Sequence, residues 1–238
     1  MKKLNVQLKD LPFAVEESLN RLRVNIKFCG KNTQKILITS SIPNEGKSFV
    51  SMHLWKMLAD AGFKTVFVDL DLRKSQINQR HNVQTAGELK GLDYYLSGNA
   101  EYEDVVYETN IENGYMIPSS NMLENPATLL EDPRFLEMFD RLSEEYRYII
   151  IDSPPLINVT DGALVASMCD GAVMVVRGGY TSKKLVKQSM QQLERVNCKL
   201  LGVVLNRVHQ NGKKYGRYYS HYEKYYEYGA YQRTEGNK

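Results

Sequence analysis

The sequence predicts an α/β protein with a doubly wound, mainly parallel sheet. Three observations lead to this prediction. Short apolar runs alternate with helical patterns from residue 11 to residue 206, the runs are continuous, and polar or acidic residues follow several of them. Continuous runs are typical of strands covered on both faces, and strands that alternate with helices form parallel sheets.

The first half of the chain is predicted to supply two helices and two strands. Apolar residues at three- and four-residue steps indicate a helix over residues 11–28. The apolar runs 35–39 and 65–69 indicate strands, since each is short and ends in a turn-rich or acidic stretch. Between them, a helix over 47–61 is closed by Gly62, a residue that readily adopts the left-handed backbone of helix ends.

The second half repeats this alternation after a mixture of loop and short helix at 78–97. Apolar runs predict the strands 115–118, 148–152, 171–176 and 200–206. Helical patterns predict the helices 126–145 (with a proline near its start), 163–168 and 181–196. Val208 is the last branched aliphatic residue, so the tail 209–238 is expected to be disordered, because it cannot bury enough apolar surface to offset its ordering entropy.

Composition and charge exclude several classes of protein. The net charge is +3, and the segment 207–238 carries seven Lys/Arg against three Glu, which leaves the body near −1. A nucleic-acid binder usually has a basic stripe on the fold itself, so we expect no nucleic-acid partner. No apolar stretch reaches the roughly 18–20 residues of a membrane span, and no apolar segment of a signal peptide follows Met1, so a cytoplasmic location is expected.

A phosphate-binding loop is predicted between the first strand and the helix that follows it. Residues 40–48 read Ser-Ser-Ile-Pro-Asn-Glu-Gly-Lys-Ser, close to the pattern G-x-x-x-x-G-K-[ST], with Ser41 at the first glycine position. Backbone N–H groups of such a loop surround phosphates, Lys47 supplies a charge, and Ser48 offers a hydroxyl to Mg²⁺. This P-loop NTPase-like pattern predicts ATP and Mg²⁺ as ligands, held by Pro43, Asn44, Glu45, Gly46, Lys47, Ser48 and Phe49.

Three carboxylates follow two of the predicted strands. Asp69 and Asp71 come at the end of one strand and Asp152 at the end of another. Ligands of open α/β sheets bind at the carboxyl ends of strands, so all three acids can meet the phosphates there. Mg²⁺ needs only one or two carboxylates, which leaves a third to position or deprotonate a hydroxyl. The alternative is that these acids are solvated residues of strand-end turns.

With these motifs, nearly the whole chain resembles the bacterial tyrosine kinases that regulate capsule and exopolysaccharide synthesis. The resemblance is carried by the loop, by Asp69-Leu-Asp71-Leu-Arg73, by Ile151-Asp152-Ser-Pro-Pro, by Asn125-Pro126, by Gly202-Val-Val-Leu-Asn206 and by the tyrosine-rich end. One departure is Asn44, where the family has Gly. Asn tolerates positive φ better than most residues, so the loop can survive this change.

The resemblance implies a role for each motif residue. Asp69 would be the base for the tyrosine hydroxyl, with Lys47 and Arg73 also catalytic. Asp71 and Asp152 would organise Mg²⁺ with Ser48, and Asn206 would lie beside the adenine. The implied organisation is an N-terminal oligomer-contact helix (1–30), a kinase domain (31–208) and a flexible tail (209–238).

The resemblance also implies partners. A membrane-bound activator, a polysaccharide co-polymerase with a cytoplasmic activating segment, would recruit the chain to the inner face of the membrane, and a cognate tyrosine phosphatase would oppose it. Family members form homo-oligomers, often rings, through a Glu and two Arg at three-residue steps of the first helix. Here these positions are Glu17, Asn20 and Arg23, with Arg21 beside the missing Arg.

The tail holds half of the sixteen tyrosines, and these are the expected phosphoacceptors: Tyr215, Tyr218, Tyr219, Tyr222, Tyr225, Tyr226, Tyr228 and Tyr231. Alternatives are an aromatic helix face, an RNA-stacking tail or an aggregation-prone tail. Each phosphate would add about −1.5 to −2, so three would reverse the positive balance of the tail. Phosphorylation is therefore expected to release a tail bound in a neighbouring subunit's site.

Two rival functions use the same loop. Partitioning and division-positioning ATPases resemble this chain, but they carry an extra Lys five residues before the loop Lys, where this chain has Ile42. The division-positioning type also ends in an amphipathic membrane-binding helix, for which this tail has no aliphatic stripe. The second rival is a non-catalytic ATP-binding scaffold, which the sequence alone does not separate from a kinase.

Overall fold

The computed structural model describes residues 2–123, 126–157 and 160–208. Asn125 and the tail tyrosines lie outside these residues. The strands are β1 (Lys2–Leu4), β2 (Lys35–Ser40), β3 (Thr65–Asp69), β4 (Tyr107–Thr109), β5 (Gly114–Ile117), β6 (Tyr148–Asp152), β7 (Gly171–Arg177) and β8 (Leu200–Asn206). The helices are α1 (Phe13–Phe28), α2 (Lys47–Asp60), α3 (Ile77–Arg80), α4 (Leu92–Leu96), α5 (Tyr102–Val105), α6 (Ala127–Leu130), α7 (Pro133–Glu145), α8 (Asp161–Ser167) and α9 (Lys183–Arg195).

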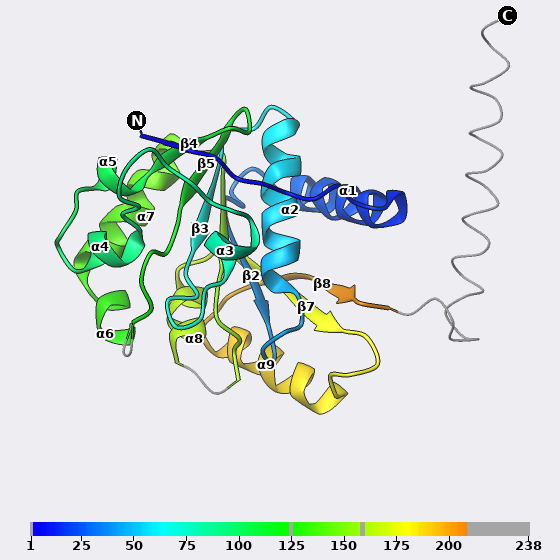
Figure 1. The fold of residues 1–238 in the computed structure, drawn as a ribbon. Helices are drawn as coiled ribbons and strands as arrows, with labels where there is room; N and C mark the ends of the chain where they lie inside the picture. The colour runs from blue at the N-terminus through cyan, green and yellow to red at the C-terminus, as the bar shows by residue number, and fades with distance from the viewer. Residues whose placement is uncertain (1, 124–125, 158–159, 209–238) are drawn as a thin grey trace, which may run out of the picture.

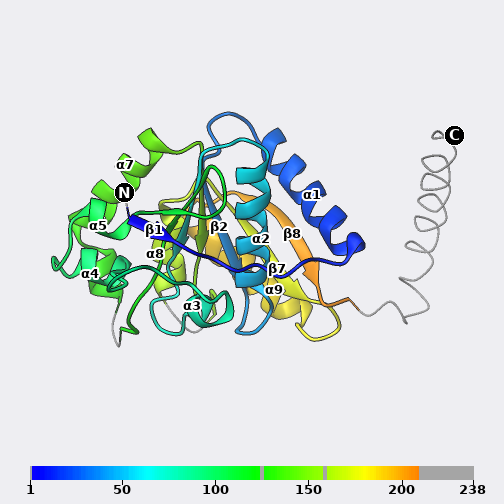
Figure 2. The ribbon, with the colours of Figure 1, turned by 45° about the horizontal axis from the view of Figure 1, so that its top comes forward.

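The eight strands form one twisted sheet in the order β1-β4-β5-β3-β6-β2-β7-β8 (Figure 1). All neighbouring strands run parallel except β4 and β5, which are antiparallel. Helices cover both faces, with α1 and α2 on one side and α7, α8 and α9 on the other (Figure 2). The doubly wound, mainly parallel sheet that the alternation predicts is therefore confirmed.

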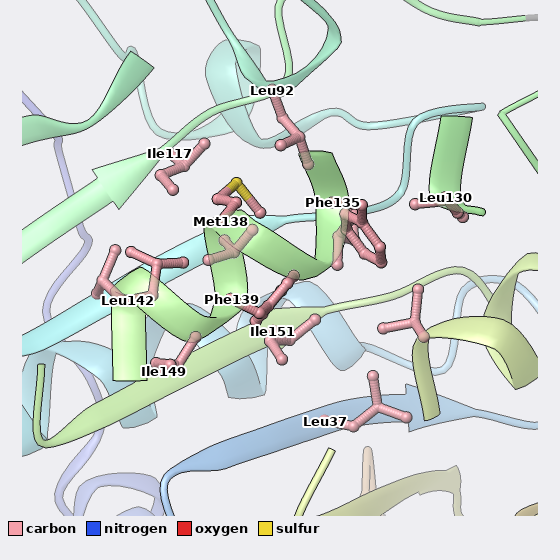
Figure 3. Close-up of a cluster of buried hydrophobic side chains, with 14 of the residues drawn as sticks. Leu37, Leu92, Ile117, Leu130, Phe135, Met138, Phe139, Leu142, Ile149 and Ile151 are labelled. Carbon is pink, nitrogen blue, oxygen red and sulfur yellow. The ribbon is translucent and has the colours of Figure 1, made fainter. Parts of the chain in front are cut away.

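Each face of the sheet has its own apolar core. On one face, Phe135, Phe139 and Leu142 of α7 pack on Ile149 and Ile151 of β6, as Figure 3 shows. On the other face, Trp55 of α2 is fully buried in a cluster that includes strand residues of β2, β3 and β6. Because β2, β3 and β6 are buried on both faces, their carboxyl ends are held in fixed relative positions.

The single helix expected over 126–145 is wrong. The segment forms two helices, α6 and α7, and the second begins at Pro133. Proline has no N–H and fits the first turn of a helix, while the Asp132 side chain accepts a hydrogen bond from the backbone N–H of Arg134 as the cap. A local cap therefore ends one helix and starts another within a continuous helical pattern.

The sequence analysis missed β1, β4 and α5. Residues 2–4 add an edge strand parallel to β4, and Leu4 and Val6 are buried. Both strands are three residues long, too short to give a periodic signal. None of the described helices is long and apolar enough to cross a membrane.

Candidate nucleotide and phosphoryl-transfer site

The carboxyl ends of β2, β3 and β6 meet at one edge of the sheet, where α2 also begins (Figure 1). Asp69 ends β3 and lies in register with Asp152 at the end of β6. Lys47 is the first residue of α2, and its ammonium lies 3.0 Å from Oδ2 of Asp71. The fold thus brings the loop and all three predicted acids together.

The loop 41–46 makes its tight turn although Ser41 stands at the first glycine position of the phosphate-loop pattern. Asn44 adopts φ +64° and Gly46 adopts φ +99°. Asn44 therefore takes the positive φ for which Asn is better suited than most residues, as expected. A Cβ on Gly46 would lie 2.1 Å from Nδ2 of Asn206, so this position has no room for a side chain. Ser41 has no positive φ, and its Oγ accepts a hydrogen bond from Ser189 of α9, 2.9 Å away.

The N-terminus of α2 presents unsatisfied backbone donors to the cavity. Among the described residues, no side chain caps this end of the 14-residue helix, and its first turn holds no acidic residue. The first N–H groups of a helix lack internal partners, and they carry a partial positive charge. The arrangement fits an anionic ligand such as a phosphate group.

Lys47 is the central cation of the site. Its side chain and that of Asp71 are about nine-tenths buried, at 11% and 12% exposure. Burial lowers the pKa of Lys47, but the carboxylates of Asp152, Asp71 and Asp69 outweigh it, so the net shift is upward. Lys47 is therefore charged at neutral pH.

Asp152 is fully buried, and neither of its carboxylate oxygens has a hydrogen-bond partner of good geometry among the described residues. Burial raises its pKa to about 6, against the lowering effect of Lys47 and of the nearby Ser48 and Ser51 hydroxyls. A buried carboxylate without partners is costly, so its two oxygens are suited to a cation or to water bound by one.

Asp69 is also fully buried, but its oxygens are occupied. Oδ1 accepts from the N–H of Asp71, and Oδ2 accepts from the hydroxyl of Ser75. Burial, with the charge of Asp152 next, raises the pKa of Asp69 to about 7. A pKa near neutrality suits a general base, although in this structure the Ser75 hydroxyl occupies Oδ2 of the carboxylate.

A cavity of about 410 Å³ opens beside these groups. Its lining comes from the phosphate loop and the start of α2, from the segment after β3, from the segment after β6 and from the end of β8: Pro43, Asn44, Gly46, Lys47, Ser48, Phe49, Asp71, Arg73, Lys74, Ser75, Gln76, Ile77, Arg80, Pro154, Pro155, Ile157 and Arg207. Asp71 reaches the cavity directly, whereas Asp69 lies behind Ser75.

Two predicted site residues have their side chains committed elsewhere. The buried carboxylate of Glu45 accepts from the Ile42 N–H, the Arg177 N–H and the Thr181 hydroxyl, which ties the loop to β7. Glu45 can therefore offer a ligand only its backbone. The Arg73 guanidinium lines the cavity but makes two hydrogen bonds to Asp161, at 2.6 and 3.2 Å.

Asn206 lies at the end of β8 beside the loop and not in the cavity lining. Its Nδ2 donates to the carbonyl of Glu45 at 2.9 Å, and its Oδ1 accepts from the N–H of Arg207. It therefore supports the loop in this structure, whereas the neighbouring Arg207 reaches the cavity.

Three residues that the sequence analysis did not single out hold the site together. Ser75 binds Asp69, Asp161 binds Arg73, and Ser189 binds Ser41. Asp161 and Ser189 lie 88 and 148 residues from their partners, so no local sequence pattern predicts these contacts. Ser75 lies six residues from Asp69, in a turn segment where a serine is unremarkable.

The residues expected at an oligomer contact are all on α1, where Arg21 and Arg23, two residues apart, do not share a face of the helix. Glu17 and Arg23 are half-buried and Arg21 is exposed.

Among the described residues, no group of three His, Cys, Asp or Glu side chains could hold a metal ion alone. A cation at this site would therefore need the Ser48 hydroxyl, water or ligand oxygens as further partners, as Mg²⁺ commonly does.

Comparison with known proteins agrees with this geometry. A family model described as an AAA domain matches residues 33–203. A tyrosine-protein kinase, CpsD of Streptococcus agalactiae, is 40% identical over 203 residues, which cover 85% of this chain and 88% of that protein. The chain belongs to the bacterial tyrosine-protein kinases. The kinase domain of the Escherichia coli tyrosine kinase ETK has a similar structure, with a TM-score of 0.76, 29% identity, and coverage of 87% of this chain and 84% of the domain.

The first rival shares the fold at greater distance. The septum site-determining protein MinD of Pyrococcus horikoshii OT3 matches with a TM-score of 0.63 and 24% identity, over 75% of this chain and 72% of that protein. A likeness at that identity shows the fold alone. The kinase is therefore the better assignment, and the fold is one that binds nucleotides.

Proposed function

We propose that this chain transfers the γ-phosphoryl group of ATP to tyrosines of its own tail, and that it thereby regulates capsule or exopolysaccharide synthesis. The observation that carries the proposal is the convergence of Lys47, Asp69, Asp71 and Asp152 at the N-terminus of α2, beside a cavity of about 410 Å³. Phosphoryl transfer depends mainly on positioning and charge, which these groups supply.

The loop and α2 would hold the phosphates. Backbone N–H groups of residues 44–49 and the charge of Lys47 are the donors that a triphosphate requires. Ser48, Asp71 and Asp152 would hold Mg²⁺, and the partnerless buried oxygens of Asp152 support this assignment. When bound, Mg²⁺ neutralises charge that develops on the phosphates. Arg207 lies where the cavity meets the end of β8, so the nucleoside is expected on that side, near Asn206.

Asp69 would accept the proton of the tyrosine hydroxyl. Its raised pKa, about 7, supports this role. Because the Ser75 hydroxyl and a tyrosine hydroxyl would both donate to Oδ2, Ser75 must give way as the acceptor enters. Arg73 would act from its ion pair with Asp161, which fixes the segment after Asp71 against the start of α8.

The partners follow from the family. We propose a homo-oligomer that uses Glu17, Arg21 and Arg23 of α1, and a ring as its closed form. A membrane-bound co-polymerase would activate the chain through a cytoplasmic segment and would hold it at the inner face of the membrane. A tyrosine phosphatase would reset the tail. Sedimentation should give a smaller assembly after phosphorylation, and an unchanged size would contradict the proposed release of the tail.

The kinase test uses the full chain with Mg·ATP and the activator segment of a relative, followed by detection of phosphotyrosine. Wild type should gain phosphotyrosine, whereas Lys47→Met and Asp69→Asn should lose it by at least about a hundredfold. Phosphotyrosine at wild-type level in both variants would identify a contaminating kinase and would contradict the proposed kinase activity of this chain. ATP hydrolysis without phosphotyrosine would favour the partitioning-type ATPase, and tight ATP binding with neither product would favour the scaffold.

A further inference from the structure

The covered carboxylate of Asp69 marks the place of the acceptor hydroxyl. The Ser75 hydroxyl donates to Asp69 Oδ2 and lines the cavity at the same time. A tyrosine hydroxyl in the proposed reaction would make the same bond to the same atom. The part of the cavity that continues from Ser75 along α3 is therefore the part that faces the rest of the acceptor peptide.

An apolar wall stands beside this position. Phe49 is 38% exposed although it is a large apolar side chain, and it lines the cavity. Its ring is held by His53, with ring centroids 4.5 Å apart. Ile77 of α3 lies at the same cavity but is buried in the core, with 1% of its surface exposed, so Phe49 supplies the accessible apolar surface. Aromatic rings pack favourably against one another, so the exposed ring of Phe49 can receive the ring of a tyrosine.

The rim beyond this wall is cationic. Lys74 and Arg80 are exposed and line the cavity. Within the described part of the chain, neither has a carboxylate partner, and Arg80 donates only to the side chain of Gln76. The single acidic residue of the lining, Asp71, pairs with Lys47. Two cations without acidic partners therefore flank the approach to Asp69.

The acceptor tail divides into two parts of opposite charge. Residues 211–220 contain Lys213, Lys214 and Arg217 and no acid, whereas residues 221–230 contain Glu223 and Glu227 and one Lys. Tyrosines that neighbour these glutamates are Tyr222, Tyr225, Tyr226 and Tyr228. A cationic rim repels the first part and attracts the second.

We propose that Lys74 and Arg80, with the exposed ring of Phe49, form an acceptor subsite that selects tyrosines flanked by acidic residues. The inference rests on the proposed kinase function and assigns these residues to its peptide substrate. It orders the tail: tyrosines of residues 222–228 are modified before Tyr215, Tyr218 and Tyr219.

The test compares two ten-residue peptides, one with the sequence of residues 211–220 and one with that of residues 221–230, phosphorylated by the full-length protein. Wild type should favour the second peptide about tenfold in kcat/KM, since two exposed charge pairs contribute about threefold each. The double variant Lys74→Gln/Arg80→Gln removes both pairs, so it should use the two peptides about equally, through a change in the KM of the peptide and with the KM of ATP unchanged. Lys184→Gln, on the exposed start of α9, is the matched control and should keep the preference.

A second arm changes the substrate. In the full chain, Glu223→Gln/Glu227→Gln should erase the early modification of residues 222–228, read by mass spectrometry over time. Equal use of both peptides by wild type, or an unchanged preference in the double variant, would overturn the subsite. A raised KM for ATP with an unchanged preference would assign Lys74 and Arg80 to the nucleotide and would also overturn it. Failure of the kinase proposal would look different, because neither peptide would then be phosphorylated.

Discussion

The two ends of helix α2 carry the same residue types in opposite settings. At its start, Lys47 pairs with Asp71 at 11% and 12% exposure, and Gly46 precedes the helix with φ +99°. At its end, Lys56 pairs with Asp60 at 41% and 49% exposure, and Gly62 follows with φ +85°. Burial and neighbouring charges, rather than residue type, therefore separate a functional helix end from a structural one.

Removal of either lysine should show the difference between the two helix ends. Lys47→Met should lower the free energy of unfolding by about 3–5 kcal/mol at pH 8, because it leaves three buried carboxylates without their shared cation. Lys56→Met should change it by less than about 0.5 kcal/mol, since exposed i,i+4 pairs contribute little. Urea denaturation measures both values. If both variants lose equally little free energy of unfolding, the three buried carboxylates do not depend on Lys47 to compensate their charge.

The second comparison concerns the two glycines. Gly62→Ala should cost about 1 kcal/mol, because positive φ is unfavourable for Ala but no atom lies within 4 Å of the new Cβ. Gly46→Ala should cost about 2–3 kcal/mol and weaken ATP binding at least tenfold, since the Cβ also meets Asn206. Nucleotide titration and thermal unfolding measure these effects.

A further substitution checks the cause of the Gly46 effect. Gly46→Ala/Asn206→Ala removes the amide that the new Cβ would meet, so the double variant should regain part of the lost stability relative to Gly46→Ala. If Asn206→Ala instead adds its full cost to that of Gly46→Ala, the two side chains do not meet, and backbone strain alone explains the loss.

The third comparison concerns His53, which lies midway between the two ends of α2. Burial lowers its pKa to about 4, with help from the positive charges of His81 and Lys56. Between pH ~6.5 and ~4 the unfolded chain binds the extra proton, so stability falls as pH falls through this window. His53→Gln should remove about 1–2 kcal/mol of the loss between pH 7 and pH 5. Urea denaturation at both values measures it, and the same slope in both proteins would contradict the assignment.

Much of this site could be predicted because its signals are local. Asn44 and Gly46 stand at the turn positions that need positive φ, and Asp69 and Asp152 follow apolar strands, whose carboxyl ends meet at one edge of a parallel sheet. The position of Phe49 after Ser48 led to its prediction as a nucleotide-binding residue, and the structure places it in the cavity lining.

The rest depended on pairings between distant segments. The side chain of Glu45 turns to Arg177 and Thr181, which lie 132 and 136 residues away, and Arg73 turns to Asp161. Such partners are chosen by the packing of loops at the sheet edge, for which sequence periodicity carries no information. The same holds for β1, whose three residues are held by burial of Leu4 and by pairing with β4.

The central claim is that γ-phosphoryl groups of ATP reach the tail of this chain. The most direct measurement labels the full-length protein with ATP radioactive at the γ-phosphate, beside a variant in which the eight tail tyrosines are phenylalanine. Wild type should carry the label, the variant should carry none, and both should bind ATP with equal affinity. Equal labelling of the two proteins would contradict it, because the phosphoryl group would then have gone elsewhere.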